Sequence, residues 1–101
     1  MSTARKILII DDDEDLQESL SDQLALHQEF DTVSASTASE GIDKARSEHI
    51  DLVLLDVGLP DMDGRESCKI LRKNGFKSPI IMLTYAALGQ PHQSGDHRRS
   101  R

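Results

Sequence analysis

The sequence contains a single cysteine, no tryptophan and no long apolar run, and these absences exclude several classes of protein. A lone thiol cannot form an internal disulfide, so Cys68 gives no sign of a secreted domain and is interpreted as a small apolar filler on a helix. No apolar stretch approaches the roughly 18 residues of a membrane-spanning helix, and residues 7–10 are too short for a signal-peptide core. We therefore expect a cytoplasmic protein without membrane contact.

The 101 residues suit one small domain, and its charge is strongly acidic. The net charge is −6, but residues 86–101 carry +2, so residues 1–85 carry −8. A domain this acidic is repelled by the phosphate backbone of nucleic acids. The three arginines near the C-terminus have no aromatic or helical framework and are a poor nucleic-acid-binding motif. We expect no direct nucleic-acid binding, and instead a surface suited to cations and basic partners.

Short apolar runs alternate with amphipathic stretches through the first 84 residues. Strands are expected where β-branched and apolar residues cluster, at residues 6–10, 30–36, 51–57 and 80–84. The first helix is expected to have the acids at residues 13–15 in its first turn, followed by leucines at a spacing of four from Leu16. The second would be capped by Thr37 or Ser39, and the third would run from about residue 64 to 73 before an Asn-Gly stop signal.

This β-α-β-α-β-α-β order predicts an α/β fold with a doubly wound parallel sheet and right-handed crossovers. Ligands of such sheets bind beyond the carboxyl ends of the strands. Asp11 and Asp12 follow the first strand, and Asp56 lies at the end of the third. These three carboxylates are therefore expected to meet at one edge of the sheet.

Carboxylates that converge at one edge repel each other, and a hard divalent cation relieves the repulsion. Mg²⁺ prefers octahedral oxygen coordination from one or two carboxylates together with water, which leaves positions for phosphate oxygens. A carboxylate nucleophile, a metal and the nearby hydroxyl of Thr84 would equip this edge for phosphoryl chemistry.

Simpler interpretations exist for the same acids. Residues 11–15 taken alone indicate a solvated helix start more than a metal site, because acids after a strand often form turns and caps. Asp61, Asp63 and Gly64 resemble a fragment of a calcium loop but lack the ligand spacing and the terminal Glu of an EF-hand. We interpret Asp61 as a turn residue and Asp63 as the cap of the third helix.

Three segments together carry a resemblance to a known family. Residues 7–13 read Ile-Leu-Ile-Ile-Asp-Asp-Asp, residues 51–64 read Asp-Leu-Val-Leu-Leu-Asp-Val-Gly-Leu-Pro-Asp-Met-Asp-Gly, and residues 78–84 read Ser-Pro-Ile-Ile-Met-Leu-Thr. In this order and spacing they resemble bacterial two-component response regulator receiver domains. The sequence of the loop is most similar to that of receivers attached to winged-helix DNA-binding domains. The resemblance covers residues 5–84 and implies a flavodoxin-like fold.

The resemblance also implies a role for each matching residue. Asp56 would be the phosphoacceptor, and a histidine kinase or a phosphotransfer protein would donate the phosphoryl group. Asp12 would bind Mg²⁺ directly and Asp11 would assist through water, while Asp56 and the backbone carbonyl of Gly58 would complete the metal site. Thr84 would hydrogen-bond the phosphoryl group as the switch hydroxyl.

The sequence departs from this family after Thr84. Receivers continue into a fourth helix, a fifth strand and a fifth helix, and the fifth strand begins with a Lys that pairs with the phosphoryl group. No Lys follows Lys77 in this chain, and residues 85–101 match none of those elements. We therefore expect residues 1–84 to form a partial receiver, and residues 85–101 to be a disordered tail foreign to the family.

Two functions stay open at this point. The first is a phosphoacceptor switch that is not an enzyme in the usual sense. The second is a truncated receiver without phosphotransfer, acting as a dimerisation or interaction module through the edge of its fourth strand, or having no function. A metal-dependent phosphatase with an aspartyl nucleophile would need a second Asp two residues after Asp56, and Gly58 occupies that position.

Overall fold

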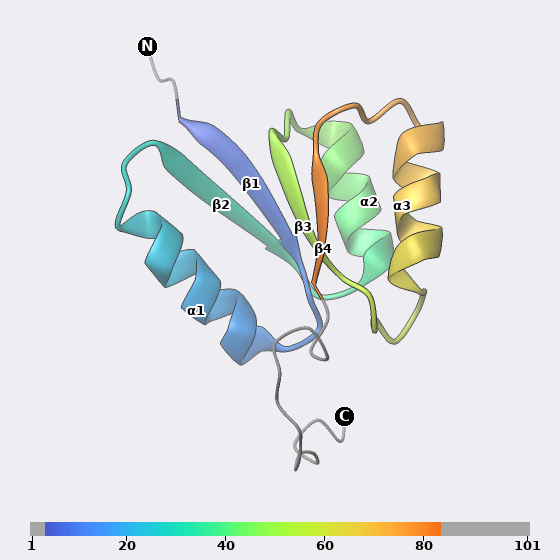
Figure 1. The fold of residues 1–101 in the computed structure, drawn as a ribbon, viewed down its shortest axis with the longest axis horizontal. Coiled ribbons are helices and arrows are strands. Elements are labelled where there is room, and N and C mark those ends of the chain that lie inside the picture. The colour runs from blue at the N-terminus through green and yellow to red at the C-terminus, as the bar shows by residue number, and fades with distance from the viewer. Residues whose placement is uncertain (1–3, 84–101) are drawn as a thin grey trace.

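Four parallel strands form one sheet in the order β2-β1-β3-β4 (Figure 1). The computed structural model describes residues 4–83. The elements are β1 (Arg5–Ile10), α1 (Glu14–Ala25), β2 (Phe30–Ala35), α2 (Ala38–Ser47), β3 (Leu52–Asp56), α3 (Gly64–Lys73) and β4 (Ile80–Leu83). The predicted doubly wound α/β fold is therefore confirmed. No helix within these residues is long and apolar enough to cross a membrane.

The central strand is β1, which pairs with β2 on one side and β3 on the other. Its residues 7–10 are almost fully buried, because both faces of the strand are covered. Because both faces of this strand are covered, successive residues are all apolar instead of alternating between apolar and polar. This explains the Ile-Leu-Ile-Ile sequence of residues 7–10. The strand ends where Asp11 interrupts that run.

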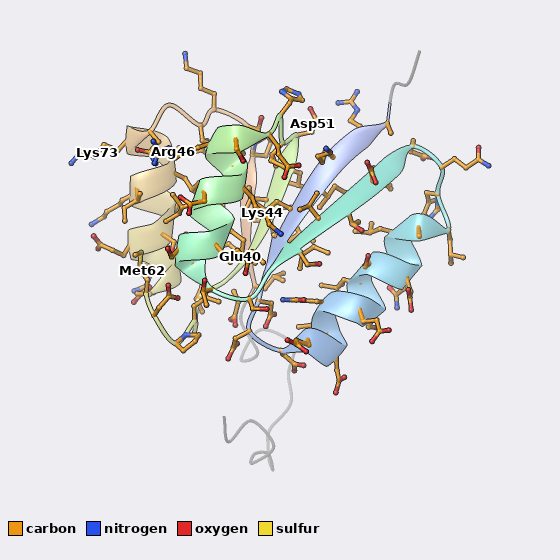
Figure 2. All side chains as sticks on the ribbon, turned by 180° about the vertical axis from the view of Figure 1, so that it is seen from behind. Glu40, Lys44, Arg46, Asp51, Met62 and Lys73 are labelled. Atoms are coloured by element: carbon orange, nitrogen blue, oxygen red, sulfur yellow. The ribbon has the colours of Figure 1, made fainter. Side chains whose placement is uncertain are left out.

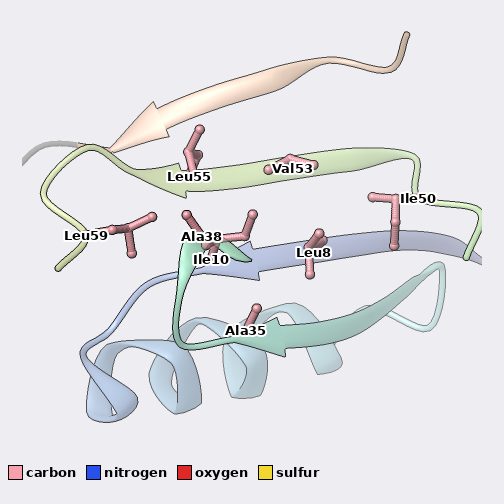
Figure 3. Packing of buried hydrophobic residues seen from close by; sticks show 8 residues of the cluster. All are labelled: Leu8, Ile10, Ala35, Ala38, Ile50, Val53, Leu55 and Leu59. Carbon is pink, nitrogen blue, oxygen red and sulfur yellow. The ribbon is translucent and has the colours of Figure 1, made fainter. Parts of the chain in front are cut away.

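Helices cover the two faces of the sheet unequally (Figures 1 and 2). On one face α2 and α3 enclose the main apolar core, whose central side chains come from alternate positions of the strands (Figure 3). The half-buried Cys68 of α3 packs against this core, as the sequence predicted. On the other face α1 packs mainly against β2. The buried residues of the core cluster are Leu8, Ile10, Ala35, Ala38, Ile50, Val53, Leu55 and Leu59.

Each helix begins at a side chain that accepts a backbone N–H. Asp13 caps α1, Thr37 caps α2 and Asp63 caps α3. Thr37 is thus the cap of α2 rather than Ser39, and the predicted cap at Asp63 is confirmed. Such caps satisfy N–H groups that have no partner inside the helix.

Asp61 has a larger role than the turn residue that we expected. Its carboxylate accepts the N–H of Ala38 at 2.9 Å and the N–H of Ser39 at 3.1 Å. These hydrogen bonds, led by the one from Ala38, hold the pKa of Asp61 below its usual range. The loop after β3 is therefore fastened to the first turn of α2, close to the carboxyl edge of the sheet.

A glycine permits the closest approach of α2 to the sheet. A Cβ at Gly41 would lie 2.6 Å from Cγ1 of Ile10, whose side chain is fully buried. We expect Gly41→Ala to lower the free energy of unfolding by about 1–3 kcal/mol, because this overpacking outweighs the better helix propensity of alanine. Urea unfolding would measure the change, with Ser47→Ala, on the exposed face of α2, as a control within about 0.5 kcal/mol of the parent.

A double mutant tests the cause of this destabilisation. Ile10→Ala removes the Cδ1, Cγ1 and Cγ2 atoms that a Cβ at Gly41 would meet, so the double variant should lose less stability than the sum of the two single losses. Additive losses would contradict the proposed clash.

Candidate metal centre at the carboxyl edge of the sheet

Three carboxylates meet where β1 and β3 end. Ile10 lies opposite Leu55 in the register of these neighbouring strands, so Asp11 and Asp56 leave the sheet side by side. One oxygen from each of Asp11, Asp12 and Asp56 lies within 4.8 Å of the others. This spacing allows one small cation to contact all three side chains, and the convergence predicted from the sequence is confirmed.

Two of these carboxylates are buried and only half satisfied. Asp11 is 1% exposed and Asp56 is 3% exposed. The Oδ1 atom of Asp11 accepts the N–H of Asp13 at 2.9 Å, and Oδ1 of Asp56 accepts the N–H of Gly58 at 3.0 Å. The Oδ2 atoms of both residues are buried without a hydrogen-bond partner among the described residues. A buried carboxylate oxygen without a partner is costly, so the donor set fits a hard divalent cation.

Electrostatics at this edge disfavour three negative charges in the absence of a cation. Burial raises the pKa of Asp11 to about 6, against its ordinary value of 3.8. The hydrogen bond from the N–H of Asp13 acts in the opposite direction, while the carboxylates of Asp56, Asp12 and Asp13 raise the pKa further. A carboxylate that keeps its proton nearly to neutral pH has a strongly unfavourable ionised state, which a metal ion would stabilise.

Two further site residues were predicted, Gly58 and Thr84, and only Gly58 lies within the described residues. Gly58 lies beside Asp56, but the contact it makes there is through its N–H and not through its carbonyl. Its role as a carbonyl ligand stays a prediction. Thr84, the predicted switch hydroxyl, lies outside the described residues.

The alternative interpretation of residues 11–15, as a solvated helix start, is correct for the second part of this acidic run. Asp13 caps α1, and Glu14 and Asp15 lie exposed in the first turn of that helix. Negative side chains there interact favourably with the helix dipole. The acidic run therefore divides between Asp11 and Asp12, which belong to the carboxylate cluster with Asp56, and a helix start from Asp13 onward.

The sequence analysis missed Gln17, which is almost fully buried in α1. Its side-chain amide donates to the backbone carbonyl of Asp11 and, at 3.0 Å, to that of Ala35. One signal in the sequence could have identified it. Gln17 precedes Leu20 and Leu24 by three and seven residues, so a polar side chain lies on the apolar stripe of an amphipathic helix.

A separate cavity of about 360 Å³ lies at the opposite end of the sheet. Its walls come from the ends of α2 and α3 and from the segments that lead into β3 and β4, including Arg46, Ile50, Leu71, Phe76 and Lys77. Figure 2 shows Arg46 at this end of α2 and Lys73 at this end of α3. Basic residues in the last turn of a helix complement its dipole. This cavity takes no part in the carboxylate site.

The fold and the carboxylate cluster together define a flavodoxin-like protein with an acidic centre beyond its central strands. The family model of the response regulator receiver domain matches residues 7–93. This chain therefore belongs to the response regulator receiver family. The match continues past residue 84, so the domain boundary that we expected there remains a proposal.

Two curated relatives are regulators of transcription. The alkaline phosphatase synthesis transcriptional regulatory protein PhoP of Bacillus subtilis is 42% identical over 80 residues, which are 79% of this chain and 33% of that protein. The transcriptional regulatory protein PmrA of Pectobacterium parmentieri is 44% identical over 80 residues, covering 78% of this chain and 35% of that protein. This chain thus spans about a third of the length of these relatives.

Solved receiver structures agree with the fold. A CheY-like receiver domain protein from Methanospirillum hungatei superposes with a TM-score of 0.73 at 34% identity, covering 80% of this chain and 64% of that one. The response regulator TrrA of Thermotoga maritima, solved in complex with Mg²⁺-BeF, gives a TM-score of 0.73 at 31% identity, with 79% and 69% covered.

The raised pKa of Asp11 predicts how stability depends on pH without metal. Between about pH 4 and pH 6 the folded chain keeps a proton on Asp11 that the unfolded chain has released. The unfolding free energy contributed by this group therefore falls as the pH rises through that window. Asp11→Asn, which cannot ionise, should remove this decline. Urea unfolding in EDTA at several pH values would compare the two proteins, and equal slopes would contradict the prediction.

Proposed function

We propose that this chain is a phosphoacceptor switch, and that Asp56 receives a phosphoryl group from the phosphohistidine of a histidine kinase or a phosphotransfer protein. The observation that carries the proposal is the buried carboxylate of Asp56, whose Oδ2 has no hydrogen-bond partner among the described residues. One oxygen of this carboxylate lies within 4.8 Å of carboxylate oxygens of Asp11 and Asp12. Membership of the receiver family supports the proposal. The names of PhoP and PmrA further support a role in regulating transcription, and we assign the chain to the cytoplasm.

The chemistry transfers one group between two side chains. A carboxylate oxygen of Asp56 attacks the phosphorus atom, a P–O bond forms, and the P–N bond to the donor histidine breaks. The electron pair stays on the imidazole nitrogen, and the product on this chain is an acyl phosphate. The Gly58 N–H would hold Oδ1 of Asp56 in a fixed orientation during the transfer. The chain turns over no separate substrate, so we class it as a switch rather than an enzyme.

We propose Mg²⁺ as the metal, held by Asp11, Asp12, Asp56 and the backbone carbonyl of Gly58. Two buried oxygens, one on Asp11 and one on Asp56, have no hydrogen-bond partner within residues 4–83, and this supports the fit of a hard cation here. When bound, Mg²⁺ would neutralise negative charge on the carboxylates and on the phosphoryl oxygens. The Thr84 hydroxyl is proposed to hydrogen-bond the phosphoryl group.

Asp56→Asn tests the phosphoacceptor directly. An amide oxygen is a poor nucleophile, so we expect labelling of the chain by a small acyl phosphate with Mg²⁺ to disappear. Intact-mass spectrometry would detect the added phosphoryl group. EDTA should also abolish labelling of the unchanged chain, because the buried carboxylates then lack a counter-charge.

Two controls make this result specific. Asp22→Asn alters an exposed carboxylate of α1 and should label like the unchanged chain. Amide NMR spectra should show that Asp56→Asn keeps the fold. Undiminished labelling of the Asp56 variant would sink the assignment, and equal loss in the Asp22 variant would show that labelling follows total charge.

A second copy of the chain is a further proposed partner, and β4 is the surface that favours it. Within residues 4–83, β4 pairs only with β3, and no described strand lies along its other edge. Ile81 is 49% exposed and Met82 is 40% exposed on this strand. An exposed apolar edge strand is a template for pairing with another chain.

Ile81→Lys tests this dimer. A charge on an apolar edge strand opposes pairing, so we expect the dimer fraction to fall strongly while the fold is kept, since Ile81 is already half exposed. Light scattering coupled to size-exclusion chromatography, at concentrations from about 10 to 500 μM, would measure it. Leu26→Lys, at the most exposed apolar residue beside α1, is the matched control and should leave association unchanged. A monomer at every concentration would exclude the dimer.

A further inference from the structure

The loop between β1 and α1 carries two of the proposed metal ligands in succession. Asp11 is the first residue after the strand and Asp12 the second, while α1 begins at Glu14. The peptide unit between Asp11 and Asp12 is shared by the backbones of both residues. Because this unit is planar, a contact that fixes its orientation constrains the backbone from which both carboxylates project.

Gln17 makes this contact from the first turns of α1. Its Nε2 atom donates to the carbonyl oxygen of Asp11, which belongs to the peptide that joins Asp11 to Asp12. The same nitrogen donates to the carbonyl of Ala35, 3.0 Å away at the end of β2. A side-chain amide has two N–H donors, so these two carbonyls can use both, and the hydroxyl of Ser36 at 3.3 Å is a weaker third contact.

The contact joins three elements at the metal centre. The carbonyl of Ala35 also accepts the backbone N–H of Asp11 at 3.0 Å, so Ala35 and Gln17 hold Asp11 from both of its peptide groups. Gln17 is only 9% exposed, and water therefore has little access to replace its amide. The ends of β1 and β2 are tied to α1 through one side chain.

We propose that Gln17 is a positioning residue of the metal centre, which sets the Asp11–Asp12 peptide so that both carboxylates face the cation. This inference rests on the proposed function, because it assigns Gln17 a role in binding Mg²⁺ at Asp11 and Asp12. Groups that orient metal ligands commonly change metal affinity by about tenfold or more when they are removed. A purely structural role for a buried glutamine would instead change stability alone.

Gln17→Met separates these two roles, because methionine is unbranched and of similar length but donates no hydrogen bond. We expect the dissociation constant of the full chain for Mg²⁺ to rise about tenfold at pH 7.5. Amide NMR titration with MgCl₂ would measure it, at a temperature where unfolding is negligible. Labelling by a small acyl phosphate should fall at low Mg²⁺ and recover when Mg²⁺ is raised.

Three further variants complete the design. Ile50→Val deletes a buried methyl group at the far end of the sheet and should lower stability without changing Mg²⁺ affinity. Gln23→Met makes the same chemical change on the exposed side of α1 and should change neither property. Gln17→Asn keeps an amide that is too short to reach both carbonyls, so it should weaken Mg²⁺ binding even if the methionine variant does not fold.

The outcomes distinguish this inference from the proposed function. Unchanged Mg²⁺ affinity in the folded Gln17 variants, or an equal loss in Ile50→Val, would overturn the positioning role and leave the proposed function standing. Failure of the unchanged chain to bind millimolar Mg²⁺ would overturn both. Loss of affinity confined to the Gln17 variants would support the positioning role.

Discussion

The main constraint on this structure is that the carboxylates of Asp11 and Asp56 are buried side by side at the carboxyl edge of the sheet. Each has one oxygen in a backbone hydrogen bond and one without a partner among the described residues. This arrangement opposes folding at Asp11, because burial above all, and the neighbouring carboxylates in addition, disfavour its ionised form and raise its pKa. It persists because the strands that carry these residues are anchored by the apolar core, in which residues 7–10 are almost fully buried.

The loops around this edge are held by local polar contacts. Asp13 turns its backbone N–H toward Asp11 and its carboxylate toward the first turn of α1. Asp61 fastens the loop after β3 to the start of α2. Gln17 ties the loop after β1 to the end of β2. Loops beyond a parallel sheet can hold a site only when something fixes them, and each is fixed here by a side chain that hydrogen-bonds backbone groups.

The sequence predicts the elements of residues 4–83 and the three converging acids, because both follow from rules that act over short distances. Apolar β-branched runs mark the strands, and the residue after a parallel strand faces the ligand edge whatever the details of packing. The parts that escaped prediction depend on distances across the fold. Whether Gln17 can hydrogen-bond to Ala35 depends on how α1 packs on the sheet. Whether Asp61 can hydrogen-bond to Ala38 depends on the position of the loop after β3. No local pattern separates an Asp that forms a turn from one that caps a distant helix.

The proposed metal would compete with protons for the same buried oxygens, and this competition would link the site to the stability of the fold. Near neutral pH, above its raised pKa, Asp11 is ionised in the folded chain, and its contribution to stability without a cation is then lowest. A cation that binds only the folded chain at 100 times its dissociation constant adds about 2.7 kcal/mol. Small domains are stable by only about 5–15 kcal/mol, so this increment is a large share of the total. The Asp11 carboxylate, which weakens the fold in isolation, would therefore be a group through which the proposed cation stabilises it, and removing it should alter both properties together.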